Sequence, residues 1–122
     1  MPTLRVCADT TGNKYLNNVR VNGILAAPGV EVGFLLAALN GPVADFVFRQ
    51  IGKPKQGGWY EANRQFIAPL PIPRAQPAQR AAIGRAALSL QTRWTMRREL
   101  LQAAGERIAV IGRSRYDTAW LW

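Results

Sequence analysis

The sequence predicts an α+β fold, in which a small β-sheet accompanies a short pair of helices and one long C-terminal helix. Three observations lead to this prediction. Apolar and polar residues alternate in short runs before residue 30, as they do in half-buried strands. A strongly apolar stretch at 31–51 follows helical spacing and is broken once, at Asn40-Gly41-Pro42. Within residues 76–104, a stripe from Ile83 to Leu101 steps with helical periodicity.

The front of the chain is expected to supply most of the sheet. Short strands are predicted at Leu4–Ala8, Tyr15–Val21 and Ile24–Ala27. In the first of them, Leu4, Val6 and Ala8 share one face, and Cys7 is interpreted as a small core residue. Because a strand needs neighbours and few residues precede Leu4, the chain is expected to lack an N-terminal portion.

Two buried helices should follow the strands. In Glu31–Leu39, the apolar residues recur at i, i+3, i+4 and i+7, at Val32, Leu35, Leu36 and Leu39. Asn40 or Gly41 can end this helix. Pro42 suits the first position of the next, Pro42–Ile51, because proline has no N–H to leave unpaired there.

The remaining elements are a strand, a rigid connector and the long helix. Gln65–Ala68 is predicted as a short strand, and Pro69–Pro73 as an extended connector, because each proline forces its predecessor out of helical space. The long helix should run from Gln76 to about Ala104, with Gly105 as its C-cap. One side carries a coiled-coil-like seam at Ile83, Ala87, Leu90, Trp94, Arg97 and Leu101. This seam covers under three heptads, which favours packing against another helix over a free coiled coil.

Composition argues against an enzyme that works alone. The chain has no histidine, one cysteine and seven carboxylates without a recognisable metal or acid–base spacing, so we expect no cofactor, metal or catalytic residue. It has neither a signal peptide nor an apolar run suited to a bilayer, and its single cysteine fits the cytoplasm.

The net charge of +9 points to an anionic partner. Residues 49–115 hold thirteen basic and three acidic side chains, whereas residues 1–48 are balanced. Thirteen of the sixteen basic residues are arginine, whose guanidinium grips phosphate and guanine with two hydrogen bonds. The alternative is a solvated basic surface.

The irregular stretch at 52–63, flanked by Arg49 and Arg64, is the candidate site. Its glycines allow close approach to a phosphate, its lysines supply charge, its amides can read base edges and its aromatic rings can pack on a sugar or base. The candidate DNA-binding residues are Arg49, Lys53, Lys55, Gln56, Trp59, Tyr60, Asn63 and Arg64. The alternative is a surface loop whose Trp59 packs back on the core.

Three segments, in this order, resemble the TaqI-like C-terminal specificity domains of type IIG restriction–modification enzymes and adenine-N6 DNA methyltransferases. They are DTTGNKYLNNVRV at 9–21, GFLLAALNGPVADFVFRQ at 33–50 and FIAPLPIP at 66–73. Residues 71–79 are also similar to type I specificity subunits. The resemblance implies the C-terminal part of a target-recognition domain, with the segment ahead of the proline-rich strand facing DNA. The chain departs from the pattern at Gly41, where the family usually has serine, and it lacks the family's catalytic motifs.

The sequence therefore predicts a non-catalytic module for sequence-specific recognition of duplex DNA. It divides into an α+β recognition segment at 1–75 and a helix with a tail at 76–122, which packs on the same domain or on a partner. A methyltransferase or endonuclease portion or subunit would supply the chemistry, and a helix-mediated oligomer stays open. Two alternatives remain: a helical assembly piece of a larger methyltransferase complex, or a small basic RNA-binding protein.

Overall fold

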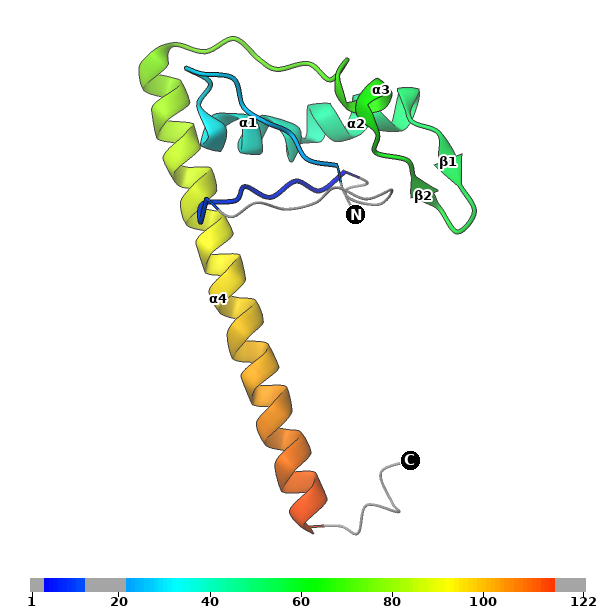
Figure 1. The fold of residues 1–122 in the computed structure, drawn as a ribbon, viewed down its shortest axis with the longest axis vertical. Helices are drawn as coiled ribbons and strands as arrows, with labels where there is room; N and C mark the ends of the chain where they lie inside the picture. The colour runs from blue at the N-terminus through cyan, green and yellow to red at the C-terminus, as the bar shows by residue number, and fades with distance from the viewer. Residues whose placement is uncertain (1–3, 13–21, 116–122) are drawn as a thin grey trace. The chain divides into compact units, whose positions relative to one another are not determined.

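The computed structural model describes residues 4–12 and 22–115, with side chains as far as residue 111. Its elements follow one another as α1 (Val32–Leu39), α2 (Pro42–Ile51), β1 (Pro54–Lys55), β2 (Trp59–Tyr60), α3 (Arg64–Ile67) and α4 (Pro77–Arg115), as Figure 1 shows. By its internal contacts the chain forms two units, Met1–Leu88 and Ser89–Trp122, with the boundary inside α4. The predicted α+β class, with a helix pair, a small sheet and a long C-terminal helix, is confirmed.

The break between α1 and α2 follows from local chemistry. Asn40 ends α1 in a right-handed conformation, and Gly41 is extended before Pro42 begins α2. Proline at this position leaves no backbone donor unpaired. Both predicted helices are therefore confirmed, and their buried residues are Gly33, Phe34, Leu36, Leu39, Ala44 and Phe48. The expectation that both helices are mostly buried was wrong in part, because Val32, Val43 and Phe46 are exposed.

The segment predicted as the first strand, Leu4–Ala8, is not a strand, and its Val6 backbone is hydrogen-bonded to a side chain. The Val6 amide donates to Asn40 Oδ1 at 3.0 Å, and Asn40 Nδ2 donates to the Val6 carbonyl at 2.9 Å. The Asn40 amide thus forms with Val6 a pair of hydrogen bonds like those of a strand ladder. Leu4 is buried as predicted, but Cys7 is exposed, so its prediction as a core residue was wrong. Side chains alternate between two faces along an extended chain, so Cys7 lies on the same face as the exposed Arg5 and on the opposite face from Leu4.

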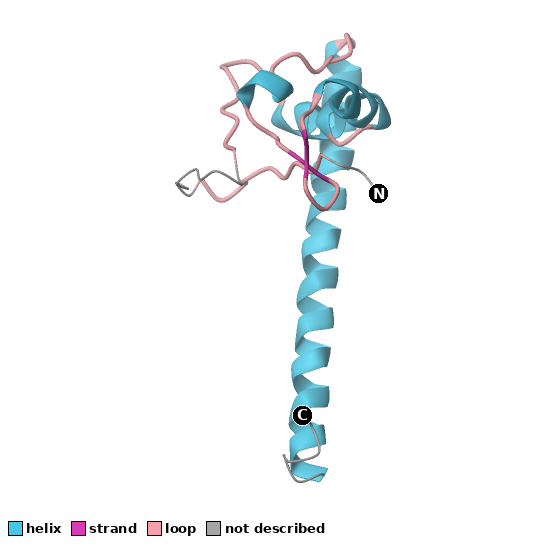
Figure 2. Ribbon diagram, turned by 90° about the vertical axis from the view of Figure 1, so that its right-hand side faces the viewer, coloured by secondary structure: helices cyan, strands magenta, loops and turns pink. Residues whose placement is uncertain are grey.

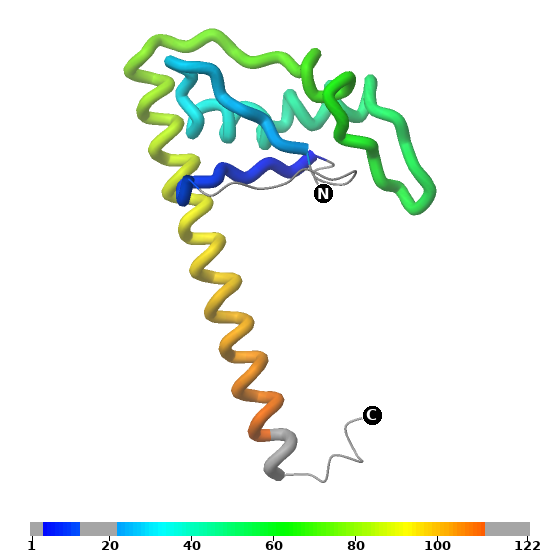
Figure 3. The backbone as a smooth tube through the Cα atoms, in the orientation of Figure 1, coloured from blue at the N-terminus to red at the C-terminus, as the bar shows by residue number. Residues whose placement is uncertain are grey.

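The predicted strand at Ile24–Ala27 is also absent, and Tyr15–Val21 lies outside the described residues. The chain here follows an irregular extended path (Figure 3) into a turn closed by the Val30 amide and the Ala27 carbonyl. Leu25 is 97% exposed. Its side chain is therefore not on the buried face of a strand.

A small core gathers side chains from segments that are distant in the sequence. Leu4, Leu39, Phe48 and Leu70 form its buried centre, and partly buried residues such as Tyr60, Phe66 and Ile67 pack around them. Phe48 on α2 has no exposed surface. The core therefore links the N-terminal segment, the helix pair, the strand β2 and the proline-rich connector.

The segment Gln65–Ala68, predicted as a strand, belongs instead to the single helical turn α3. The amides of Phe66 and Ile67 both donate to the Asn63 carbonyl at 3.0 Å. These two adjacent apolar residues both pack against the core, which a helical turn permits and strand alternation does not.

The helix α4 is longer than predicted, because it continues to Arg115 through the expected C-cap at Gly105. Glycine inside a helix costs only about 0.5–1 kcal/mol relative to alanine, which the flanking turns can offset. Near its start, α4 packs closely on α1. A Cβ added to Gly33 would lie 2.4 Å from the Gly84 carbonyl oxygen, so this approach requires glycine at position 33.

Among the described residues no single helix combines the length and apolar character needed to span a bilayer. One bent pair, α1 with α2, meets that test on length and composition alone.

Replacing Phe48 with alanine should destabilise the protein strongly, because it removes the one large side chain that is wholly buried among the described residues. A cavity of this kind typically costs about 3–5 kcal/mol. Phe46→Ala is the matched control on the same helix. The Phe46 ring is 65% exposed, so its loss should change stability by no more than about 0.5 kcal/mol. Urea unfolding followed by circular dichroism measures both, and equal losses would contradict this core.

Candidate nucleic-acid interface

The irregular stretch predicted as the candidate site folds into a β-hairpin. Pro54 pairs with Tyr60 and Lys55 with Trp59 in antiparallel register, around the turn Gln56-Gly57-Gly58. These strands, magenta in Figure 2, are the only ones in the described part of the chain. Gly57 and Gly58 have φ values of 85° and 77°, which residues with a Cβ rarely adopt. Adjacent glycines between strand-forming residues are a hairpin signal that the sequence analysis missed.

Strand alternation sends the two aromatic residues of β2 to opposite faces. Tyr60 faces the core, where its ring lies 5.9 Å from that of Phe48 at an interplanar angle of 50°. Trp59 faces away and is 75% exposed. The alternative in which Trp59 packs back on the core is therefore not what the structure shows. Tyr60 instead anchors the hairpin and fixes the face on which Trp59 stands.

The Trp59 indole lies beside the hairpin turn. A Cβ added to Gly57 would come within 3.3 Å of Trp59 Cδ1. The absence of a side chain at Gly57 thus leaves room for the ring, and the turn limits where the ring can go. A large aromatic surface is held in solvent at the tip of a short ribbon, next to the exposed amide of Gln56.

Two of the candidate cations already have carboxylate partners. Arg49 Nε lies 3.0 Å from Asp45 Oδ2 on the same helix, and Lys55 Nζ lies 3.0 Å from Glu61 Oε2. Such exposed pairs contribute little to stability, so they orient the side chains more than they stabilise the fold. Sequence reasoning overlooked both acids, although the i, i+4 spacing of Asp45 and Arg49 is a recognisable helical pair.

Lys53 and Arg64 are the exposed cations of this region that form no ion pair with another described residue. Lys53 precedes β1, and its carbonyl accepts a hydrogen bond from the Glu61 amide at 3.2 Å. Arg64 opens α3, beside a shallow hollow that Asn63, Gln65 and Ala68 also line. With four basic side chains against two acidic ones, residues 45–64 carry a net charge of +2.

Asn63 is half-buried where the chain leaves the hairpin for α3. Its side chain is one of the groups that lower the pKa of the Glu61 carboxylate. Its Oδ1 atom is buried and accepts no hydrogen bond within the described residues. Asn63 therefore links the carboxylate that holds Lys55 to the start of α3.

The eight candidate residues come from adjoining elements. Lys53, Lys55, Gln56, Trp59 and Tyr60 belong to the hairpin and its base, Arg49 lies in the last turn of α2, and Asn63 and Arg64 begin α3. The helices α2 and α3 contact each other, and the hairpin connects them (Figure 1). We call Lys53, Lys55, Gln56 and Trp59, with Arg49 and Arg64 beside them, the hairpin surface. Tyr60, packed on the core, and the half-buried Asn63 adjoin the hairpin surface but are not part of it.

The hairpin surface has no donor set for a metal. Among the described residues no three His, Cys, Asp or Glu side chains come close enough together to hold a metal ion. The chemistry that this surface offers is positive charge, amide hydrogen bonding and one exposed aromatic face.

Comparison of the chain with protein-family models, with curated proteins and with solved structures gave no match.

The Lys55–Glu61 pair leads to a prediction about titration. The hydrogen bond from Lys55 and its positive charge lower the pKa of Glu61 below the ordinary glutamate value, with smaller contributions from Asn63 and Lys53. The pair favours the folded hairpin above the ordinary glutamate pKa, and its contribution disappears as the pH falls through the lowered pKa.

An NMR titration of the Glu61 carboxyl carbon should give a midpoint below about 4.3, the usual glutamate value. In Lys55→Met the midpoint should return toward that value, whereas Lys53→Met should move it less, because the Lys53 charge is the weakest cause. The same midpoint in the wild-type protein and in Lys55→Met would contradict the pair.

Proposed function

We propose that this chain is a non-catalytic module for sequence-specific recognition of duplex DNA, and that the hairpin surface makes the contact. The observation that supports the proposal is the exposed Trp59 at the tip of a hairpin whose other aromatic residue, Tyr60, is packed on Phe48. An exposed tryptophan on an anchored ribbon, next to an exposed amide and unpaired cations, is suited to recognition and has no evident role in folding.

The chemistry of the hairpin surface fits the major groove. A two-stranded ribbon can enter this groove, where a glutamine amide can form two hydrogen bonds with adenine. Gln56, at the turn, is the residue placed to do so. Lys53 and Arg64 would contact phosphates on either side, and Trp59 would pack on a sugar or a base.

The two ion pairs of this surface would respond to DNA. Arg49 and Lys55 are held by carboxylates, and an approaching phosphate would compete with those carboxylates for them. This competition lowers the net gain from each cation. The main phosphate contacts are therefore assigned to Lys53 and Arg64.

The resemblance to TaqI-like specificity domains supports the same proposal. On that basis, the chain is the C-terminal part of a target-recognition domain, and a methyltransferase or endonuclease portion modifies the DNA. Such a module would work in the cytoplasm, where its exposed Cys7 would remain a thiol.

Selection from a randomised duplex library tests the proposal, because the bound sequences themselves reveal the target. The wild-type chain should enrich a defined sequence, and its affinity should fall as salt rises. Lys53→Ala should weaken binding equally for all sequences and reduce the salt slope by about 0.9. Gln56→Ala should relax selection at one base pair, by about 1–3 kcal/mol of discrimination.

Arg74→Ala is the matched control. Arg74 is also an exposed cation, but it lies in the proline-rich connector outside the hairpin surface. Its loss should leave the selected sequence unchanged. If Lys53→Ala and Gln56→Ala behave like Arg74→Ala, or if single-stranded RNA competes as well as duplex DNA, the proposal fails.

A further inference from the structure

The second unit exposes a long apolar helix face that the hairpin surface does not use. Within Ser89–Ile111 of α4 nearly every residue is exposed, and several of the side chains are large and apolar. They are Leu90, Trp94, Met96, Leu100, Leu101, Ile108, Val110 and Ile111. Exposed apolar surface on this scale is typical of a docking site.

Five of these residues follow a heptad repeat: Leu90, Trp94, Leu101, Ile108 and Ile111. Because α4 continues to Arg115, the seam predicted from the sequence extends beyond Leu101 and reaches Ile111. We define the docking seam as Leu90, Trp94, Arg97, Leu101, Ala104, Ile108 and Ile111, which step by four and three residues in alternation. Trp94, Leu101 and Ile108 are a positions, and the other four are d positions. Three complete heptads are enough for a helix to pack along the seam.

The charged residues of this stretch are sorted by sign around the helix. All the arginines lie in the seam or along its edges: Arg97 at d, Arg93 and Arg107 at g, and Arg98 at e. Both glutamates, Glu99 and Glu106, are at f, on the opposite side. The helix therefore presents an apolar stripe with positive edges.

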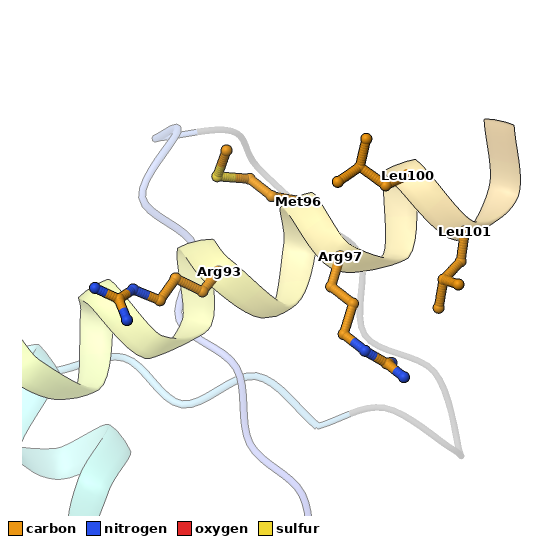
Figure 4. Close-up of a pocket in the computed structure, with 5 residues that line it drawn as sticks. All are labelled: Arg93, Met96, Arg97, Leu100 and Leu101. Atoms are coloured by element: carbon orange, nitrogen blue, oxygen red, sulfur yellow. The ribbon is translucent and has the colours of Figure 1, made fainter. Parts of the chain in front are cut away.

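Side-chain positions agree with this arrangement. The Arg97 guanidinium lies 5.2 Å from the centre of the Trp94 ring, so the one charge inside the seam is held against an aromatic face. Figure 4 shows a shallow hollow lined by Arg93, Met96, Arg97, Leu100 and Leu101. Its lining combines three apolar side chains with two arginines.

A second copy of this chain is a poor occupant of the seam. In a parallel pair in register, Arg97 would face its equivalent at a d layer, and Arg93 would face Arg98 of the other copy. In an antiparallel pair with full overlap, Arg93 would face Arg107, and Arg98 would face its equivalent. Both arrangements bring like charges together, which opposes association.

We propose that the docking seam binds one helix of a different polypeptide, with apolar residues at its own a and d positions and Asp or Glu along its edges. Carboxylates at those edges would lie opposite Arg93, Arg98 and Arg107, and one carboxylate could reach Arg97. This inference does not depend on DNA recognition by the hairpin surface. The two sites occupy different elements and can be tested separately.

Two synthetic peptides of about four heptads test the proposal on the full chain. Both carry Ile and Leu at a and d. One has Glu at every e and g position and the other has Lys. Fluorescence anisotropy of the labelled peptides should show that the Glu peptide binds at least tenfold more tightly than the Lys peptide.

Variants of the seam sharpen the test. The triple variant Arg93→Glu, Arg98→Glu, Arg107→Glu should reverse the preference, and Leu101→Asp with Ile108→Asp should weaken the binding of both peptides. Glu99→Gln, on the opposite face, is the control and should bind as the wild type does. Circular dichroism verifies that each variant keeps its helix.

Four results would overturn the proposal: equal affinity for the two peptides, no binding of either, displacement of the Glu peptide by duplex DNA, or sedimentation as a dimer that Leu101→Asp dissociates. The third would assign the arginines to nucleic acid, and the fourth would assign the seam to a second copy.

Discussion

The contact between Phe48 and Tyr60 is the constraint on which the candidate site depends. Phe48 has no exposed surface, and it shares a buried cluster with Leu4, Leu39 and Leu70. Tyr60 attaches the hairpin to that core. An aromatic pair of this kind contributes about 0.5–1.5 kcal/mol beyond the area it buries, which is enough to hold a two-stranded ribbon that would be marginal alone. Strand alternation then leaves Trp59 no inward position.

Both units carry positive charge, but the residues that surround the cations differ between them. In the hairpin surface it accompanies polar amides and a single aromatic ring, and nearby carboxylates hold two of its cations. In α4 it borders an apolar seam, and the carboxylates lie on the far side of the helix. Phosphate binding depends on the cations themselves, whereas helix docking also needs the apolar seam. The chain therefore carries two surfaces with separate chemistry.

The helices could be predicted from the sequence because their signals are local. Pro42 and the spacing of the apolar residues were enough to predict the helix pair. The long helix was predicted to end at Gly105, but a single glycine does not end a helix of this length. The prediction of a strand at Leu4–Ala8 was wrong, and the hydrogen bonds between Val6 and the Asn40 side chain are contacts that no local pattern reveals. The prediction of a strand at Gln65–Ala68 was wrong. Its two adjacent apolar residues, Phe66 and Ile67, were interpreted as part of a strand, but they lie in the helical turn α3.

For the candidate site, composition was enough to select the stretch, but not its conformation. The hairpin and the ion pair between Lys55 and Glu61 depend on which residues face each other across the turn, and the spacing of single residues does not specify this.

The most direct test of the account is to map the amide resonances of the full chain by NMR as duplex DNA is added. We expect shifts concentrated at 53–60 and at Arg64, with α4 unaffected from Ser89 to Ile111. Shifts confined to α4, or spread evenly over all the arginines, would contradict the account.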